Sequence, residues 1–209
     1  MSNQAWPNRE AQLRRLLPVF RGLSPVLDLG CGDGVALDLL KGAGERGEGV
    51  ERDHGLVEAG RRRGFTMHEG DVLAFLDGAA PDAWGAVVAS HILEHLPADR
   101  VTGFFASVAR TLRPGGRLVL LTPNPRNIGV ITRTFWGDLE HVRPYAIDLL
   151  VRLAGEAGLG IVSAGDDPYT RQPGIVHRPV TFLRRWLVGN YWPGADNLLI
   201  AEKLPSGTR

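Results

Sequence analysis

One stretch of this chain, residues 26–34, limits its possible folds more than any other. It reads Val-Leu-Asp-Leu-Gly-Cys-Gly-Asp-Gly, an apolar run that breaks into a turn with glycine at every second position. Glycine leaves no side chain where another backbone or a ligand must come close. A helical pattern of apolar residues begins directly afterwards, at Val35. A strand, a glycine-rich turn and a helix in this order are typical of the nucleotide-binding corner of a doubly wound α/β sheet.

The turn does not carry the full dinucleotide-binding pattern. That pattern requires a further glycine at position 35, where this chain has Val35. Asp28 also stands where a pyrophosphate would meet negative charge. A carboxylate beside the turn suits a cationic ligand better, such as one that carries an ammonium and a sulfonium group.

Four further segments follow the glycine turn in an order that completes such a sheet. They are residues 47–51, which end in Glu51; 66–72, which contain Asp71; 86–96, which run through Ser90 and His91; and 112–123, which contain a Pro-Gly-Gly turn. One such motif is weak evidence, but five in order over about residues 24–125 resemble the class I S-adenosylmethionine-dependent methyltransferases. The resemblance implies S-adenosyl-L-methionine as the cofactor and S-adenosyl-L-homocysteine as the product.

The alternation of strand and helix patterns predicts an α/β fold with parallel pairing. We expect strands near 25–30, 46–51, 65–70, 84–90, 116–122, 161–164 and 197–203, and helices near 8–21, 34–42, 54–63, 98–110 and 145–157. The resemblance implies a Rossmann-like, doubly wound, seven-stranded sheet with helices on both faces. The sheet is expected to be mostly parallel, with the last strand antiparallel between the fifth and sixth.

The length of 209 residues predicts a single domain. We divide it into an N-terminal helical segment (1–24), a cofactor-binding half (25–122) and an acceptor-binding half (123–209). The last part contains an insertion, 166–194, in which a short helix is expected around 180–187.

The composition of the chain argues against several kinds of binding partner and cellular location. A net charge of +1 argues against a large nucleic-acid footprint. The single cysteine, Cys31, cannot form an internal disulfide, which fits a reducing cytoplasm. No apolar run approaches the ~20 residues of a membrane span. We therefore expect a cytoplasmic monomer or homodimer without a membrane span.

Ligands of an open α/β sheet bind at the carboxyl ends of its strands. By the resemblance, Glu51 accepts hydrogen bonds from both ribose hydroxyls. Asp71 accepts one from the adenine amino group, while the backbone of Val72 meets a ring nitrogen. Asp28 holds the methionine end together with the backbone of the turn, or alternatively only braces the turn. The full predicted cofactor set is Asp28, Gly30, Cys31, Gly32, Glu51, Arg52, Asp71, Val72, Ser90 and His95.

Residues 91–95 read His-Ile-Leu-Glu-His, which also matches the H-x-x-E-H pattern of zinc proteases. That pattern requires both histidines on one helical face, whereas His91 closes an expected strand. We therefore predict no metal site. His91 remains a catalytic candidate because it ends the fourth strand beside the expected sulfonium position. His95 and Cys31 are interpreted mainly as a bracing residue and a packing residue.

The segment after the fifth strand is irregular and rich in proline, arginine and aromatic residues, so we expect a long functional loop over 123–144. Its Glu-His-Val-Arg-Pro stretch resembles a subgroup of small-molecule and cell-envelope-sugar methyltransferases. His141, with an ordinary pKa near ~6.5, is the candidate general base, or it only ties the loop to the next helix. Arginines here indicate an anionic acceptor or a solvated basic surface. The predicted acceptor residues are Asn124, Arg126, Trp136, Arg143 and Tyr145.

The sequence thus predicts a methyltransferase that acts on a small molecule, at oxygen, by in-line displacement. Three alternatives stay open: an RNA or protein methyltransferase, a non-catalytic regulator that binds S-adenosylmethionine, and, more distantly, an NAD-dependent oxidoreductase.

Overall fold

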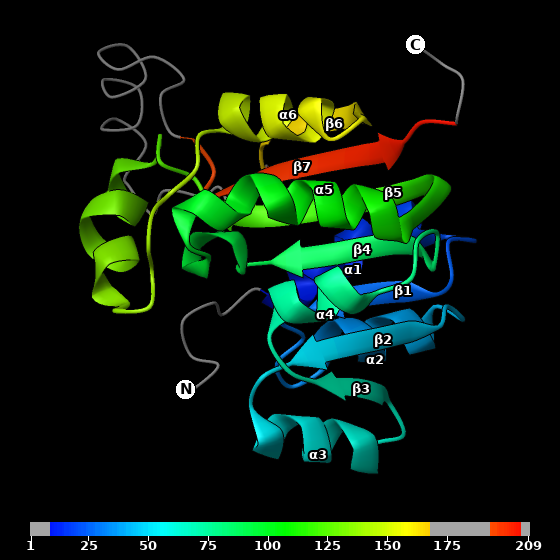
Figure 1. Cartoon of the computed structure of the whole chain (residues 1–209). Helices are drawn as coiled ribbons and strands as arrows, with labels where there is room; N and C mark the ends of the chain where they lie inside the picture. The colour runs from blue at the N-terminus through cyan, green and yellow to red at the C-terminus, as the bar shows by residue number, and fades with distance from the viewer. Residues whose placement is uncertain (1–8, 168–192, 206–209) are drawn as a thin grey trace, which may run out of the picture.

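The computed structural model describes residues 9–167 and 193–205. Its centre is a seven-stranded sheet in the order β3-β2-β1-β4-β5-β7-β6 (Figure 1). The strands are β1 (Val26–Leu29), β2 (Gly47–Glu51), β3 (Thr66–Glu69), β4 (Trp84–Ser90), β5 (Leu112–Pro123), β6 (Leu159–Asp166) and β7 (Asp196–Lys203). Strands β1 to β5 pair in parallel, whereas β7 runs antiparallel to both β5 and β6. The predicted fold class, including the place of the last strand, is confirmed.

Helices cover both faces of the sheet (Figure 1). They are α1 (Arg9–Phe20), α2 (Val35–Gly42), α3 (His54–Arg62), α4 (Val72–Gly78), α5 (Val101–Thr111) and α6 (Ile147–Glu156). Alternate strand residues point to opposite faces. Leu27 and Leu29 of β1 therefore join a core cluster with α4, α5 and α6, whereas Val26 joins one with α1, α2 and α3. Strands buried on both sides in this way are typical of parallel sheets.

The predicted elements agree with the observed ones except at four places. Strand β5 begins at Leu112, so the Pro-Gly-Gly stretch lies within the strand and not before it. Helix α4 was not predicted; it begins directly after Asp71, whose Oδ1 accepts hydrogen bonds from the backbone N–H groups of Leu73 (2.9 Å) and Ala74 (3.0 Å). The expected loop after β5 contains a π-helical turn (Val130–Thr134) and a 3₁₀ turn (Phe135–Gly137). Strand β6 is longer than expected, because it pairs with β7 along its length. The helix expected around 180–187 lies outside the described residues.

The order of the strands shows at which point of the sheet a ligand is expected to bind. It runs outward from β1 through β2 to β3 on one side and through β4 on the other, so β1 and β4 form the switch point where ligands bind. The glycine turn leaves the carboxyl end of β1 at this point. Among the described residues, no helix is long and apolar enough to cross a membrane.

Candidate donor and acceptor site

The glycine turn brings backbone and a neighbouring loop very close together. Gly30, Gly32 and Gly34 have φ angles of +66°, +57° and +81°, a region that L side chains rarely adopt. A Cβ atom on Gly30 would lie 2.0 Å from Cδ1 of Ile92. The backbone N–H groups of Gly30 and Cys31 both donate to the carbonyl of Val50, at 2.9 and 3.1 Å. Glycine is therefore required here by conformation and by space.

Asp28 is the most unusual group of the site. It lies on β1 with a relative exposure of 1%, and neither carboxylate oxygen has a hydrogen-bond partner among the described residues. Burial raises the pKa of Asp28 to about 7, because the charged form loses its hydration, while Arg9 opposes the rise. A buried carboxylate without a partner costs stability unless a ligand satisfies it. It fits a cationic donor such as S-adenosylmethionine.

Glu51 fixes the other side of the turn. Its Oε2 accepts the backbone N–H of Gly32 at 2.9 Å, and its Oε1 accepts those of Arg52 (2.8 Å) and Asp53 (3.0 Å). The carboxylate is thus held in one orientation at the carboxyl end of β2. Asp71 follows the end of β3 by two residues and caps α4 through its Oδ1. The acids associated with three neighbouring strands therefore lie along one edge of the sheet.

Arg9 is a site residue that the sequence pattern did not indicate. It begins α1, its charge lowers the pKa of Asp28, and its Nη1 would lie 3.5 Å from a Cβ atom on Gly32. Its only sequence signal is its place at the start of an amphipathic helix. Cys31, in contrast, is buried with its Sγ 3.9 Å from Sδ of Met67. Burial raises the pKa of this thiol, which supports its interpretation as a packing residue.

A buried polar network lies beyond β4. We define it as Gln12, His91, Glu94, Asp167 and Asp196. The Nε2 of Gln12 donates to Asp167 Oδ2 (2.6 Å) and to Asp196 Oδ2 (2.9 Å). His91 Nδ1 lies 3.1 Å from Glu94 Oε1, and His91 Nε2 lies 3.7 Å from Asp196 Oδ2. The network joins α1, the end of β4 and the start of β7.

His91 is held as a cation by this network. It has a left-handed φ of 57° directly after β4. Burial alone would lower the pKa of His91, but the carboxylates of Asp196 and Glu94 outweigh burial and raise it to about 10. A histidine protonated at neutral pH has no lone pair with which to accept a proton. Its neighbour Ser90 is buried, and its Oγ has no hydrogen-bond partner among the described residues.

The acceptor loop, defined as residues 124–146, folds back over this edge. The backbone N–H of Val142 donates to the carbonyl of Glu94 at 2.8 Å. His95 Nδ1 lies 3.3 Å from the carbonyl of Glu140, and Arg52 Nη2 lies 2.6 Å from Glu140 Oε2. Arg52, a predicted cofactor residue, thus pairs with the acceptor loop in this structure.

His141 lies in the centre of the loop. Its Nδ1 is 2.7 Å from the carbonyl of Phe135, its ring stacks on Phe135 at 4.5 Å, and the ring of His95 lies 4.7 Å away. A carbonyl oxygen only accepts, so Nδ1 must carry the proton. In the neutral ring the lone pair is then on Nε2, and the same reasoning applies to His95.

The five predicted acceptor residues divide into two groups. Asn124 and Tyr145 are buried; the Nδ2 of Asn124 donates to Asp166 Oδ1 (2.9 Å) and to the carbonyl of Gly194 (3.1 Å). Arg126, Trp136 and Arg143 are exposed, and the guanidinium of Arg143 lies 5.2 Å from the ring centre of Tyr145. Their roles toward an acceptor stay predictions.

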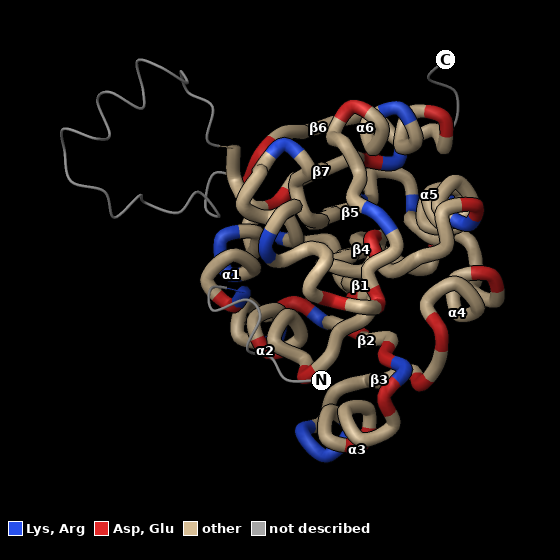
Figure 2. Tube along the Cα trace, turned by 90° about the vertical axis from the view of Figure 1, so that its left-hand side faces the viewer, with Lys and Arg blue, Asp and Glu red and all other residues tan. Residues whose placement is uncertain are grey.

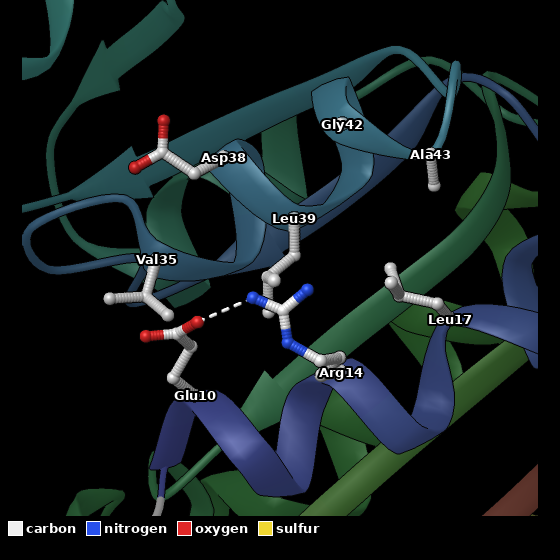
Figure 3. A pocket seen from close by; sticks show the side chains of 8 residues that line it. All are labelled: Glu10, Arg14, Leu17, Val35, Asp38, Leu39, Gly42 and Ala43. Carbon is white, nitrogen blue, oxygen red and sulfur yellow. Dashed lines mark hydrogen bonds and ion pairs between the residues drawn. The ribbon is translucent and has the colours of Figure 1, made fainter.

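Seen toward this edge, acidic positions lie near the centre of the face, around the ends of β1 and β4 (Figure 2). A separate groove of about 390 Å³ lies between α1 and α2, where Glu10 and Arg14 form an ion pair at 2.6 Å beside Val35 and Asp38 (Figure 3). None of the residues that line this groove is a predicted site residue.

The strand order and the antiparallel β7 match the Rossmann-like methyltransferase fold. The chain belongs to the family described as "Methyltransferase domain", which it matches over residues 7–164. It is therefore an enzyme that transfers a methyl group.

Solved structures share this fold at low sequence identity. An S-adenosylmethionine-dependent methyltransferase from Archaeoglobus fulgidus is 24% identical, with a TM-score of 0.79 over 93% of this chain and 92% of that one. A 1,6-didemethyltoxoflavin-N1-methyltransferase from Burkholderia thailandensis, with bound 1,6-didemethyltoxoflavin and S-adenosylhomocysteine, is 16% identical, with a TM-score of 0.65 over 97% and 82%. A putative methyltransferase from Haloferax volcanii, in complex with the Trm112 methyltransferase activator, is 15% identical, with a TM-score of 0.66 over 97% and 92%. No curated protein matches the sequence.

Proposed function

We propose that this methyltransferase acts on an oxygen atom of a small-molecule acceptor. The observation that carries the proposal is the distance of 2.7 Å between His141 Nδ1 and the carbonyl oxygen of Phe135, which favours the tautomer with its lone pair on Nε2. Such a nitrogen accepts a proton from a hydroxyl group at neutral pH. Its side chain is only 9% exposed, so water competes little for it.

The donor side is proposed to hold S-adenosylmethionine through groups of opposite or complementary charge. Asp28 would meet the ammonium group, Arg9 the carboxylate, and Glu51 the two ribose hydroxyls. Asp71 and the backbone of Val72 would meet the adenine. When bound, S-adenosylmethionine supplies a methyl group on a positively charged sulfur, which is already a good leaving group.

The protein then has to align the methyl donor with the acceptor and to exclude water from the site. Correct orientation of two reactants contributes on the order of 7–11 kcal/mol to such a transfer, whereas a general base contributes about 10²–10⁴-fold. The acceptor loop is tied to the donor side through the hydrogen bond between Val142 and Glu94 and the pairing of Arg52 with Glu140. The exposed Arg126 and Arg143 favour an acceptor that carries a carboxylate or phosphate.

The experiment that tests this proposal has two arms. Calorimetric titration with S-adenosylhomocysteine measures the donor side. Transfer is measured by mass spectrometry after incubation with S-adenosylmethionine of a panel of small hydroxy acids, sugar phosphates, small amines, RNA and protein. We expect a net mass gain of one CH2 unit, because a methyl group replaces a hydrogen. Alkaline hydrolysis then distinguishes a methyl ester, which is cleaved, from a methyl ether, which is stable. Transfer only to nitrogen, RNA or protein would overturn the proposed acceptor class, and donor binding without any transfer would favour a regulatory protein.

A further inference from the structure

Three metal-ligating side chains converge between the end of β4 and the acceptor loop. Glu94, His95 and His141 each offer one ligand atom, and these atoms all lie within 4.8 Å of one another. Glu94 and His95 belong to the 3₁₀ turn after β4, and His141 comes from the acceptor loop. The sequence pattern had suggested His91 as a partner, but its ring is committed to Glu94 and Asp196.

The two histidines have the tautomers that metal ligation requires. In protein metal sites, the ring nitrogen that does not bind the ion donates its proton to a backbone carbonyl or a carboxylate. His95 Nδ1 faces the carbonyl of Glu140 and His141 Nδ1 faces that of Phe135. Both Nε2 atoms are therefore left with lone pairs before any ion arrives.

Glu94 has the properties of a buried anionic ligand. It is fully buried, its Oε2 accepts the hydroxyl of Thr122 at 3.1 Å, and its Oε1 lies 3.1 Å from Nδ1 of His91. These partners orient the carboxylate and leave further lone pairs on both oxygens. A second carboxylate, Asp138, has its Oδ2 4.0 Å from His141 Nε2 at the rim of the cluster.

We propose that Glu94, His95 and His141 form a binding site for one divalent transition-metal ion of the Zn²⁺ type. Two imidazoles and one carboxylate suit Zn²⁺, whereas Mg²⁺ prefers oxygen ligands alone. Three protein ligands leave one position of a tetrahedral ion open for water or an acceptor oxygen. This departs from the sequence prediction of no metal site.

The inference rests on the proposed function in one respect: an oxygen atom of the acceptor would be the fourth ligand of the metal ion. The metal and a proton compete for the same lone pair, so His141 is a ligand in the metal-loaded chain and a proton acceptor in the metal-free chain. The two forms make metal binding and methyl transfer separable by experiment.

The test is a calorimetric titration of the chelator-treated full chain with Zn²⁺ alone, with Co²⁺ absorption as a direct signal of ligation. We expect one equivalent bound, no comparable binding of Mg²⁺, and an affinity about 100-fold or more weaker in His95→Asn and His141→Asn. Asparagine at 141 retains a donor for the carbonyl of Phe135 and removes the ligand nitrogen. His54→Asn is the matched control, because His54 also pairs with a carboxylate, Glu69 at 3.0 Å, but lies on α3.

An unchanged far-UV circular dichroism spectrum shows that each variant is folded. Absence of Zn²⁺ binding and of a Co²⁺ signal in the wild type overturns the metal site and leaves the proposed transfer intact. Equal metal affinity in both site variants and the control overturns it as well.

Discussion

The donor side and the acceptor side of this site are built in different ways. Donor residues stand at strand ends, where Asp28, Glu51 and Asp71 are placed by consecutive parallel strands and by hydrogen bonds to adjacent backbone. Acceptor-side residues stand on irregular backbone that is held by contacts between distant segments, such as that between Val142 and Glu94. The first arrangement fixes one invariant ligand, whereas the second allows the acceptor to change without a change of scaffold.

The largest effect that distinguishes the acceptor side from the donor side is a loss of kcat, expected for a substitution of His141. His141→Asn should lower kcat by about 10²–10⁴-fold, because the proton acceptor is lost while the hydrogen bond to Phe135 is retained. The affinity for S-adenosylhomocysteine should not change. Steady-state kinetics and calorimetry measure the two quantities, with His54→Asn as the control. Equal kcat values for the wild type and the variant would contradict the assignment of proton transfer to His141.

The next effect is expected on the donor side. Glu51→Ala should weaken S-adenosylhomocysteine by about 100-fold or more, since two charge-assisted hydrogen bonds and the anchor of Gly32 are lost together. Glu69→Ala is the matched control, because Glu69 pairs with Glu51 in register on the neighbouring strand. Calorimetric titration measures both. Unchanged affinity in Glu51→Ala would refute its proposed role at the ribose.

A smaller effect is expected from pH. The pKa of Asp28 is about 7 in the free chain, and an ammonium group favours its ionised form. Affinity for S-adenosylhomocysteine should therefore fall about tenfold per unit as the pH drops from 7 to 5, and binding in that range should release about one proton. Titration in buffers of different ionisation enthalpy counts the proton. Asp28→Asn should bind more weakly and without this pH dependence; an unaltered pH profile in the variant would remove Asp28 from the site.

The raised pKa of Asp28 affects the stability of the ligand-free chain in the opposite direction: a rise in pH favours ligand binding but lowers stability. An acid whose folded pKa is raised holds its proton more tightly when folded, so its contribution to stability is lost as the pH rises from about 4 to about 7. Urea unfolding at several pH values should show a flatter profile for Asp28→Asn than for the wild type.

The smallest effect is expected at the ion pair that joins the two sides. Arg52 and Glu140 are 2.6 Å apart but largely exposed, and such pairs contribute about 0.2–1 kcal/mol. Glu140→Gln should thus change the affinity for S-adenosylhomocysteine by less than about fivefold, with a larger loss at low salt. A change as great as that of Glu51→Ala would mean that the two sides are not independent.

Sequence reasoning could place the predicted donor residues relative to the strands because the signals for them are local. A short stretch of sequence is enough to identify each feature: the glycines at 30, 32 and 34, and the acids at the strand ends. In the structure these features lie along one edge of the sheet. It missed α4 because Asp71 was interpreted as a ligand only, although its Oδ1 also caps that helix.

The acceptor side could not be predicted in the same way. The approach of His141 to His95 and Glu94 joins segments more than forty residues apart through backbone carbonyls, which no residue pattern encodes. The pairing of His91 with Asp196 likewise depends on the antiparallel placement of β7. Arg9 contacts the glycine turn only because α1 packs on α2, so its role has no local signal.

The two flanks of the segment between β6 and β7 meet at one point. The backbone N–H of Asp167 donates to the carbonyl of Asp196 at 2.8 Å, and Gln12 binds both side chains. A stretch of chain that leaves and re-enters a scaffold through one clasp can be lengthened, shortened or exchanged at little entropic cost to the sheet. Changes in the length or sequence of the intervening residues can therefore be accommodated while the pairing of β6 with β7 is kept.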